Sequence, residues 1–201
     1  QYHLGNSTEA IGYLTDYVNA VDAPERSALF ALGVCEFRKG DYENAKTHVG
    51  AVTDADDVMA QSAYLFMGQM YLKDDNLNAA ALAFEKAYKM PYDESTRETA
   101  FYNYALAQSR GGRTPVSSSV KLFQDFLNKF PNSRYASNVE DYIINSYMTS
   151  KDYDNALLCI EALKSPSAKM MKAKQNVLYR LGMRELQAGK PTSAADFLTR
   201  A

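Results

Sequence analysis

Apolar residues recur at helical spacing along the whole chain, in segments separated by short polar turns. In one such segment, Leu29 and Leu32 fall on one face of a helix that we expect from about residue 25 to residue 39. Gly40 and Asp41 follow it. Glycine readily closes a helix, and an aspartate side chain accepts hydrogen bonds from the free amides where a helix begins. The pattern therefore predicts a helix-turn-helix unit.

This unit repeats along the chain. The segment GDYENA at residues 40–45 returns nearly unchanged as KDYDNA at residues 151–156. Ala45 and Ala156 are 111 residues apart, which divides into three units of about 37 residues. The small residues at this place in each unit are 35 to 39 residues apart, and they are Ala10, Ala45, Ala80, Ser119, Ala156 and Ala194. A period of this length predicts an all-α solenoid of stacked helix pairs.

We expect one solenoid over the whole chain, with a lone helix followed by five antiparallel helix pairs and no β-sheet. Its expected divisions are residues 1–22 (the second helix of a truncated repeat), 23–55, 56–91, 92–131, 132–166 and 167–201 (truncated at the C-terminus). Small residues in both helices of a pair let the helices approach closely. Gly33 should therefore lie near Ala45, and Gly68 near Ala80. Asn6 is the expected N-cap of the first helix.

The repeated positions resemble the tetratricopeptide repeat. Tyr64-x-x-Met67-Gly68-x-x-Tyr71, followed by Ala80-x-x-x-Phe84-x-x-Ala87, matches the signature of that family. The resemblance covers the whole chain and implies a right-handed superhelix that binds a protein or peptide on its concave face. There are three departures from the signature. Ile144 stands where the fourth copy should have a small residue, and Glu36 and Glu185 replace the tyrosine.

The resemblance further implies that the first helix of each pair lines the concave surface. The residues at these positions are Phe30, Val34, Phe37, Arg38, Leu65, Gln69, Leu72, Lys73, Tyr102, Leu106, Arg110, Asp141, Asn145, Met148, Tyr179 and Met183. They would form an amphipathic peptide groove. The alternative is that about half of the apolar ones bury against neighbouring helices.

Three of these groove residues, Arg38, Lys73 and Arg110, occupy equivalent places in successive first helices and would suit an acidic peptide that contains aromatic residues. A cation in the last turn of a helix is also favoured by the helix dipole wherever it points, so simple stabilisation of the helix end stays open as the alternative. Phe30 and Val34 stand where the family's clamp for a chaperone-tail carboxylate needs lysine and asparagine. That partner is therefore disfavoured.

The segment Phe130-Pro-Asn-Ser-Arg-Tyr-Ala136 resembles a link between repeats of bacterial cell-envelope proteins, such as the outer-membrane assembly lipoprotein and the Tol-Pal-associated division coordinator. This resemblance implies a periplasmic or cell-envelope location. The alternative is that Pro-Asn-Ser is ordinary turn and cap chemistry, in which case a cytoplasmic location remains open.

Composition narrows the classes of partner. The 201 residues carry a net charge of -2, so the chain has no general electrostatic attraction to nucleic acid or anionic membrane. No run of 18 apolar residues could cross a bilayer. Cys35 and Cys159 lie inside helical patterns and are expected to be buried thiols.

No constellation predicts catalysis. His3 and His48 lack the spacing to cysteine or carboxylate that a metal site or a nucleophile-base pair needs. The segment Gly189-Lys190-Pro191 is a repeat turn, because proline occupies the place of the serine or threonine of a phosphate-binding loop. We therefore expect no catalytic residue, no metal and no cofactor. The sequence predicts a non-enzymatic protein-binding scaffold. Its alternatives are a cytoplasmic adaptor or sensor, and a regulatory region attached to an enzyme domain outside this segment.

Overall fold

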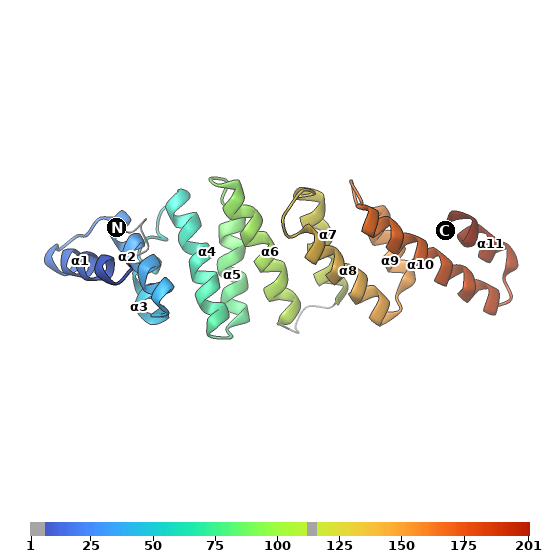
Figure 1. Cartoon of the computed structure of the whole chain (residues 1–201), viewed down its shortest axis with the longest axis horizontal. Helices are drawn as coiled ribbons and strands as arrows, with labels where there is room; N and C mark the ends of the chain where they lie inside the picture. Colours follow the sequence, from blue (N-terminus) through green and yellow to red (C-terminus); the bar gives the residue numbers. More distant parts are fainter. Residues whose placement is uncertain (1–6, 112–115) are drawn as a thin grey trace. The chain divides into compact units, whose positions relative to one another are not determined.

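The structure is a computed structural model that describes residues 7–111 and 116–201. Over these residues it contains eleven α-helices and no β-strand (Figure 1). The helices are α1 Ser7–Ala20, α2 Arg26–Lys39, α3 Tyr42–Gly50, α4 Val58–Lys73, α5 Leu77–Lys89, α6 Glu94–Arg110, α7 Val116–Lys129, α8 Ala136–Ser150, α9 Tyr153–Glu161, α10 Ala168–Gln187 and α11 Pro191–Arg200. The predicted all-α fold is confirmed. The predicted cap Asn6, as well as His3, lies outside the described residues.

The chain divides into two compact units, residues 1–113 and 114–201. In the first unit, each helix from α1 to α6 packs against the next one along the chain, and α4 also contacts α2 and α6. In the second unit, each helix from α7 to α11 packs against the next one, and α8 also contacts α10. Each unit is therefore a helical-repeat stack. The third expected pair has its first helix, α6, in one unit and its second helix, α7, in the other.

The turns inside the pairs share one backbone conformation, which explains the repeated sequence motif. Gly40, Asp75, Lys151 and Gly189 all have positive φ, between 56° and 88°, in the left-handed region that closes a helix. In three of these turns the next residue donates its amide hydrogen to a carbonyl five residues back, as from Asp41 to Glu36 at 3.0 Å.

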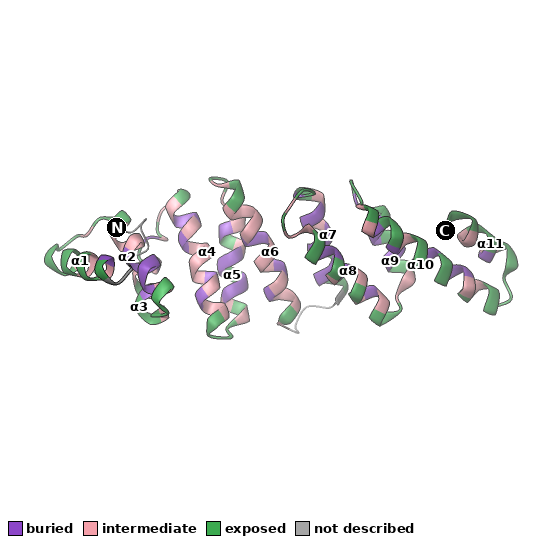
Figure 2. Cartoon of the chain, viewed as in Figure 1, coloured by how far each residue is buried: buried purple, intermediate pink, exposed green. Residues whose placement is uncertain are grey.

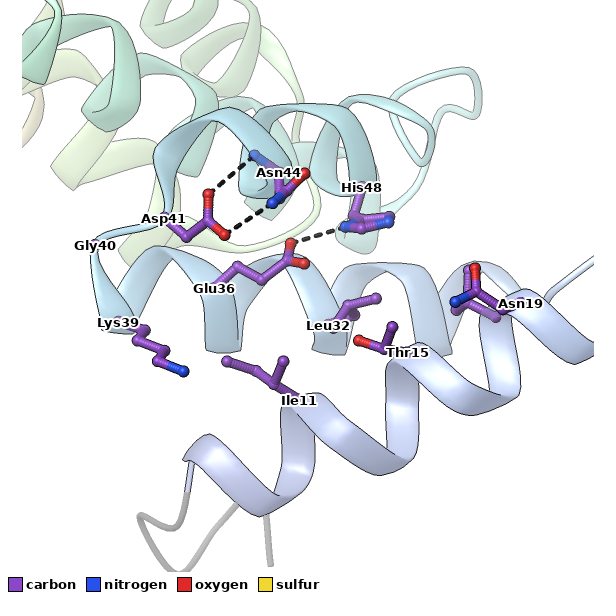
Figure 3. A pocket seen from close by; sticks show the side chains of 11 residues that line it. Ile11, Thr15, Asn19, Leu32, Glu36, Lys39, Gly40, Asp41, Asn44 and His48 are labelled. Carbon is purple, nitrogen blue, oxygen red and sulfur yellow. Dashed lines mark hydrogen bonds and ion pairs between the residues drawn. The ribbon is translucent and has the colours of Figure 1, made fainter.

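The second helix then begins with a side-chain cap. Asp41, Asn76 and Asp152 each accept a hydrogen bond from the backbone amide three residues further along. The cap of Asp41 on Asn44 is visible in Figure 3.

Close approach of paired helices depends on glycine, as the sequence predicts. A Cβ atom added to Gly33 would lie 2.6 Å from Val49 Cγ2 and 3.2 Å from the carbonyl oxygen of Ala45. A Cβ on Gly182 would lie 2.6 Å from Leu198 Cγ. A Cβ on Gly68 would meet the ring of Phe84 at 2.5 Å, so the nearest atoms there are those of Phe84 rather than Ala80. These separations leave no room for a side chain on the first helix.

Buried residues line the contacts between helices, while the opposite sides of most helices are exposed (Figure 2). Cys35 and Cys159 are both buried, as predicted. Among the residues that the structure describes, no helix is long and apolar enough to cross a membrane.

Candidate functional site

The candidate site of the first unit lies on its first helices, α2, α4 and α6. Phe30 and Phe37 of α2 are half-buried, and both rings contact Phe66 of α4, with centroid distances of 5.9 and 5.3 Å. Both also pack against the core formed by Ala45, Val49 and Val52. These two aromatic side chains therefore join neighbouring repeats and still keep part of their surface exposed.

Val34 differs from the other predicted groove residues because it is 1% exposed. It lies one turn from Phe30 and one turn from Phe37 on α2, the helix whose phenylalanines contact α4. The packing of α4 against α2 accounts for this burial. A peptide could not reach the Val34 side chain, and its role is in the interior.

The predicted groove residues of α4 and α6 are half-buried. Leu65 and Leu72 pack against the cluster around Ala80, Phe84 and Ala107. Gln69, Tyr102 and Leu106 are also partly accessible. The sequence left open that the apolar groove residues bury against neighbouring helices. Leu65 and Leu72 bury part of their side chains in this way.

The three predicted cations of the first unit are exposed. Arg38, Lys73 and Arg110 each lie in the last turn of their helix, α2, α4 and α6. The helix dipole favours positive charge at this end. Their placement is therefore consistent both with a binding role and with simple helix stabilisation.

The candidate site of the second unit includes a cavity of about 420 Å³. Tyr179 and Met183 of α10, both predicted from sequence, line it together with Lys151, Tyr153 and Arg180. Tyr179 is 55% exposed. Arg180 lies over the Tyr153 ring, 5.5 Å from its centroid, and donates to the Tyr153 hydroxyl at 3.3 Å. The cavity therefore combines aromatic walls with positive charge.

Arg184, which also lines this cavity, is already paired. It donates two hydrogen bonds to Asp154, at 2.6 and 3.0 Å. This pairing stabilises the carboxylate and lowers the pKa of Asp154. Lys151 and Arg180 are therefore the cations of this cavity best able to meet a negatively charged partner.

The remaining predicted residues lie on α8. Asp141 and Asn145 are exposed and Met148 is half-buried. Asp141 forms an ion pair with Lys169 of α10 at 2.6 Å. This exposed pair connects the two first helices of the second unit, and such pairs contribute little to stability.

Sequence reasoning missed Lys151, Tyr153 and Arg180. A signal was available, because Lys151 and Tyr153 belong to the repeated KDYDNA segment and Arg180 follows the predicted residue Tyr179. Turn formation alone explains the KDYDNA segment in the sequence, so periodicity does not mark Lys151 and Tyr153 as site residues. In the described part of the chain, no group of three or more histidine, cysteine, aspartate or glutamate residues could hold a metal ion.

Helix pairs that meet at small residues, with capped turns of one conformation, define an α-helical repeat protein. Comparison with known families agrees. Two tetratricopeptide repeat models match the chain, one at residues 1–46 and 37–95 and the other at residues 99–133. Together these ranges span more than half of the sequence, and the chain belongs to the tetratricopeptide repeat family.

No curated protein matches the chain. A solved structure with a similar fold is the crystal structure of BtubC (BKLC) from P. vanneervenii. The TM-score is 0.51 at 14% sequence identity, and the alignment covers 96% of this chain and 86% of that one. At this identity the similarity concerns the fold.

Proposed function

We propose that the chain is a non-enzymatic scaffold that binds a segment of a partner protein along its first helices. The observation that carries this proposal is the cavity beside Tyr179 and Met183. An exposed tyrosine next to Lys151 and Arg180 suits a segment in which an aromatic or aliphatic residue neighbours an acidic one.

The first unit supports the same partner chemistry. Phe30 and Phe37 keep part of their aromatic surface accessible, and Arg38 follows Phe37 in the sequence of α2. Lys73 and Arg110 provide positive charge at the same end of α4 and α6. Aromatic residues and arginine are the residue types most enriched where protein partners bind.

Site-specific photo-crosslinking tests this function. A benzoylphenylalanine at Tyr179 should give a discrete crosslinked partner in the native host. The control position is Tyr13 of α1, which is equally aromatic and 70% exposed but lies on a second helix. The same products at both positions, or none at Tyr179, would remove the basis for this site.

We also propose that the protein belongs to the bacterial cell envelope. The support is the resemblance of residues 130–136 to the repeat link of envelope proteins. The full gene tests this proposal. A signal peptide or a lipoprotein cysteine, together with recovery of the protein in the periplasmic or membrane fraction, would agree with it. A cytoplasmic fraction would favour the adaptor or sensor alternative, and an appended catalytic domain would favour the regulatory one.

A further inference from the structure

A second cavity, of about 550 Å³, lies between α1 and α3 over the C-terminal half of α2 (Figure 3). Thr15 and Asn19 of α1 line one side, and His48 of α3 and its N-cap residue Asp41 line the other. Glu36 of α2 lies between them. None of these residues belongs to the first-helix site described above.

Glu36 is a buried carboxylate, with only 6% of its surface exposed. Its Oε2 atom lies 2.8 Å from Nδ1 of His48. A carboxylate only accepts, so Nδ1 carries the hydrogen. Among the described residues, His48 is the single hydrogen-bond partner of the Glu36 side chain, which leaves the Oε1 atom able to accept from a ligand. Burial of a carboxylate is costly unless its oxygens are satisfied.

One departure from the repeat pattern lies at this cavity. Three residues after the small position, the second and fourth repeats have Tyr71 and Tyr147, and the first has Glu36. The cavity lined by Tyr147, which also lies among three successive helices, is about 300 Å³, roughly half the volume of the Glu36 cavity. A tyrosine ring fills space that the shorter glutamate leaves open.

The fifth repeat has glutamate at the same place, which allows a comparison inside one chain. Glu185 is flanked by Arg184 at 3.4 Å and Lys190 at 3.8 Å. Lys190 and Asp41 occupy equivalent positions, because each lies four residues before the small residue of its second helix, Ala194 and Ala45 respectively. The fifth repeat therefore neutralises its half-buried glutamate with its own cations, whereas the first repeat adds a second carboxylate.

We propose that the Glu36 cavity binds a cationic group, either a guanidinium or a primary ammonium. Its charged lining groups are Glu36 and Asp41 against Lys39. The Glu36 Oε1 atom, the Thr15 hydroxyl and the Asn19 amide oxygen offer acceptors to a group that has only donors. The cation can come from a small amine or from a basic side chain of a protein. This inference is independent of the proposed first-helix function.

The test uses two probes, agmatine and an acetylated, amidated Gly-Ser-Arg-Ser-Gly peptide, followed by amide chemical shifts in two-dimensional NMR. Both should shift residues of α1, α2 and α3. Binding of the peptide alone would identify a protein side chain as the source, and equal binding of agmatine would identify a small amine. A peptide with citrulline in place of arginine should not bind.

Three variants separate this site from general attraction to acidic surface. Glu36→Gln should weaken binding at least about tenfold, equivalent to about 1.4 kcal/mol. Glu185→Gln, its counterpart in the fifth repeat, should leave binding unchanged. Glu36→Tyr restores the residue of the second and fourth repeats, so it should fill the cavity and abolish binding while preserving the helical circular dichroism spectrum.

The proposal is overturned if neither probe shifts α1–α3 at about 10 mM, a concentration that detects even weak ligands. It is also overturned if Glu36→Gln and Glu185→Gln weaken binding equally. If Glu36→Tyr fails to fold, the comparison of the two glutamine variants still decides the outcome.

Discussion

The side chain of Gln61 on α4 binds the backbone of Asp93 at the start of α6. Its Oε1 atom accepts from the Asp93 amide at 2.6 Å, and its Nε2 atom donates to the Asp93 carbonyl at 3.3 Å. The same Nε2 group donates to the carbonyls of Ala87 and Met90 at the end of α5. Gln61 is fully buried, so one amide satisfies the polar backbone of the turn between two repeats.

Gln61→Leu should destabilise the protein by about 2–4 kcal/mol, because it leaves several buried backbone groups without partners. Chemical denaturation would measure the change. Gln175→Leu is the matched control, since Gln175 is exposed on α10 and its replacement should change stability by less than about 0.5 kcal/mol. Similar losses in both variants would contradict the role assigned to Gln61.

Gly68→Leu should destabilise by about 1–3 kcal/mol through overpacking, because even a Cβ atom would meet the Phe84 ring at 2.5 Å. Gly12→Ala provides the opposite case. Gly12 lies inside α1 with nothing within 4 Å of an added Cβ, so alanine should stabilise by about 0.5–1 kcal/mol through helix propensity. Melting temperatures of the two variants should therefore move in opposite directions. An unchanged melting temperature for Gly68→Leu would count against the packing of α4 on α5.

Replacing Arg38, Lys73 and Arg110 together by glutamine should weaken binding of the crosslinked partner about tenfold at low ionic strength, since three exposed cations contribute modestly and additively. Binding by the unmodified protein should also weaken with added salt, as screening requires. The control variant replaces three exposed lysines outside the predicted groove, Lys89, Lys164 and Lys172. Unchanged affinity in the first variant would leave the apolar residues from Phe30 to Met183 as the binding surface.

Acid should weaken the start of α4 through Asp57. Arg26 donates to this carboxylate at 2.6 Å, and together with the backbone amide of Ala60 it lowers the pKa of Asp57 from 3.8 to about 2. Because the pKa of Asp57 is lower in the folded state than in the unfolded state, its ionised carboxylate stabilises the fold above a pH of about 4. This stabilisation is lost as the pH falls from about 4 to about 2. Asp57→Asn keeps a capping side chain but removes the charge.

The melting temperature of Asp57→Asn should therefore fall less steeply than that of the unmodified protein between pH 4 and pH 2. Melting curves of both proteins across this range measure the difference. Identical slopes would show that the Arg26 pair does not contribute to acid sensitivity.

The helices were predictable because the repeat fixes where small residues and caps stand. Gly33 beside Ala45 and the Asp41 cap follow directly from periodicity. The burial of Val34 does not follow from periodicity, because it depends on how closely α4 approaches α2. That distance is set by side chains from another repeat, such as Phe66. The replacement of tyrosine by Glu36 was visible in the sequence. The cavity it leaves was not, because its walls come from three helices.

The stacking of helices in chain order has a consequence for folding. Within each unit a helix packs mainly against its neighbours in sequence, so contact order is low and little loop-closure entropy opposes folding. The stability of such a stack is the sum of the intrinsic stabilities of its repeats and of the interfaces between neighbouring repeats. Helices at the end of a stack have fewer neighbours. Hydrogen exchange in the first unit should accordingly be fastest in α1 and slowest in α4 and α5. The unit would then open from α1 inward, through a gradient of local unfolding energies rather than one global threshold.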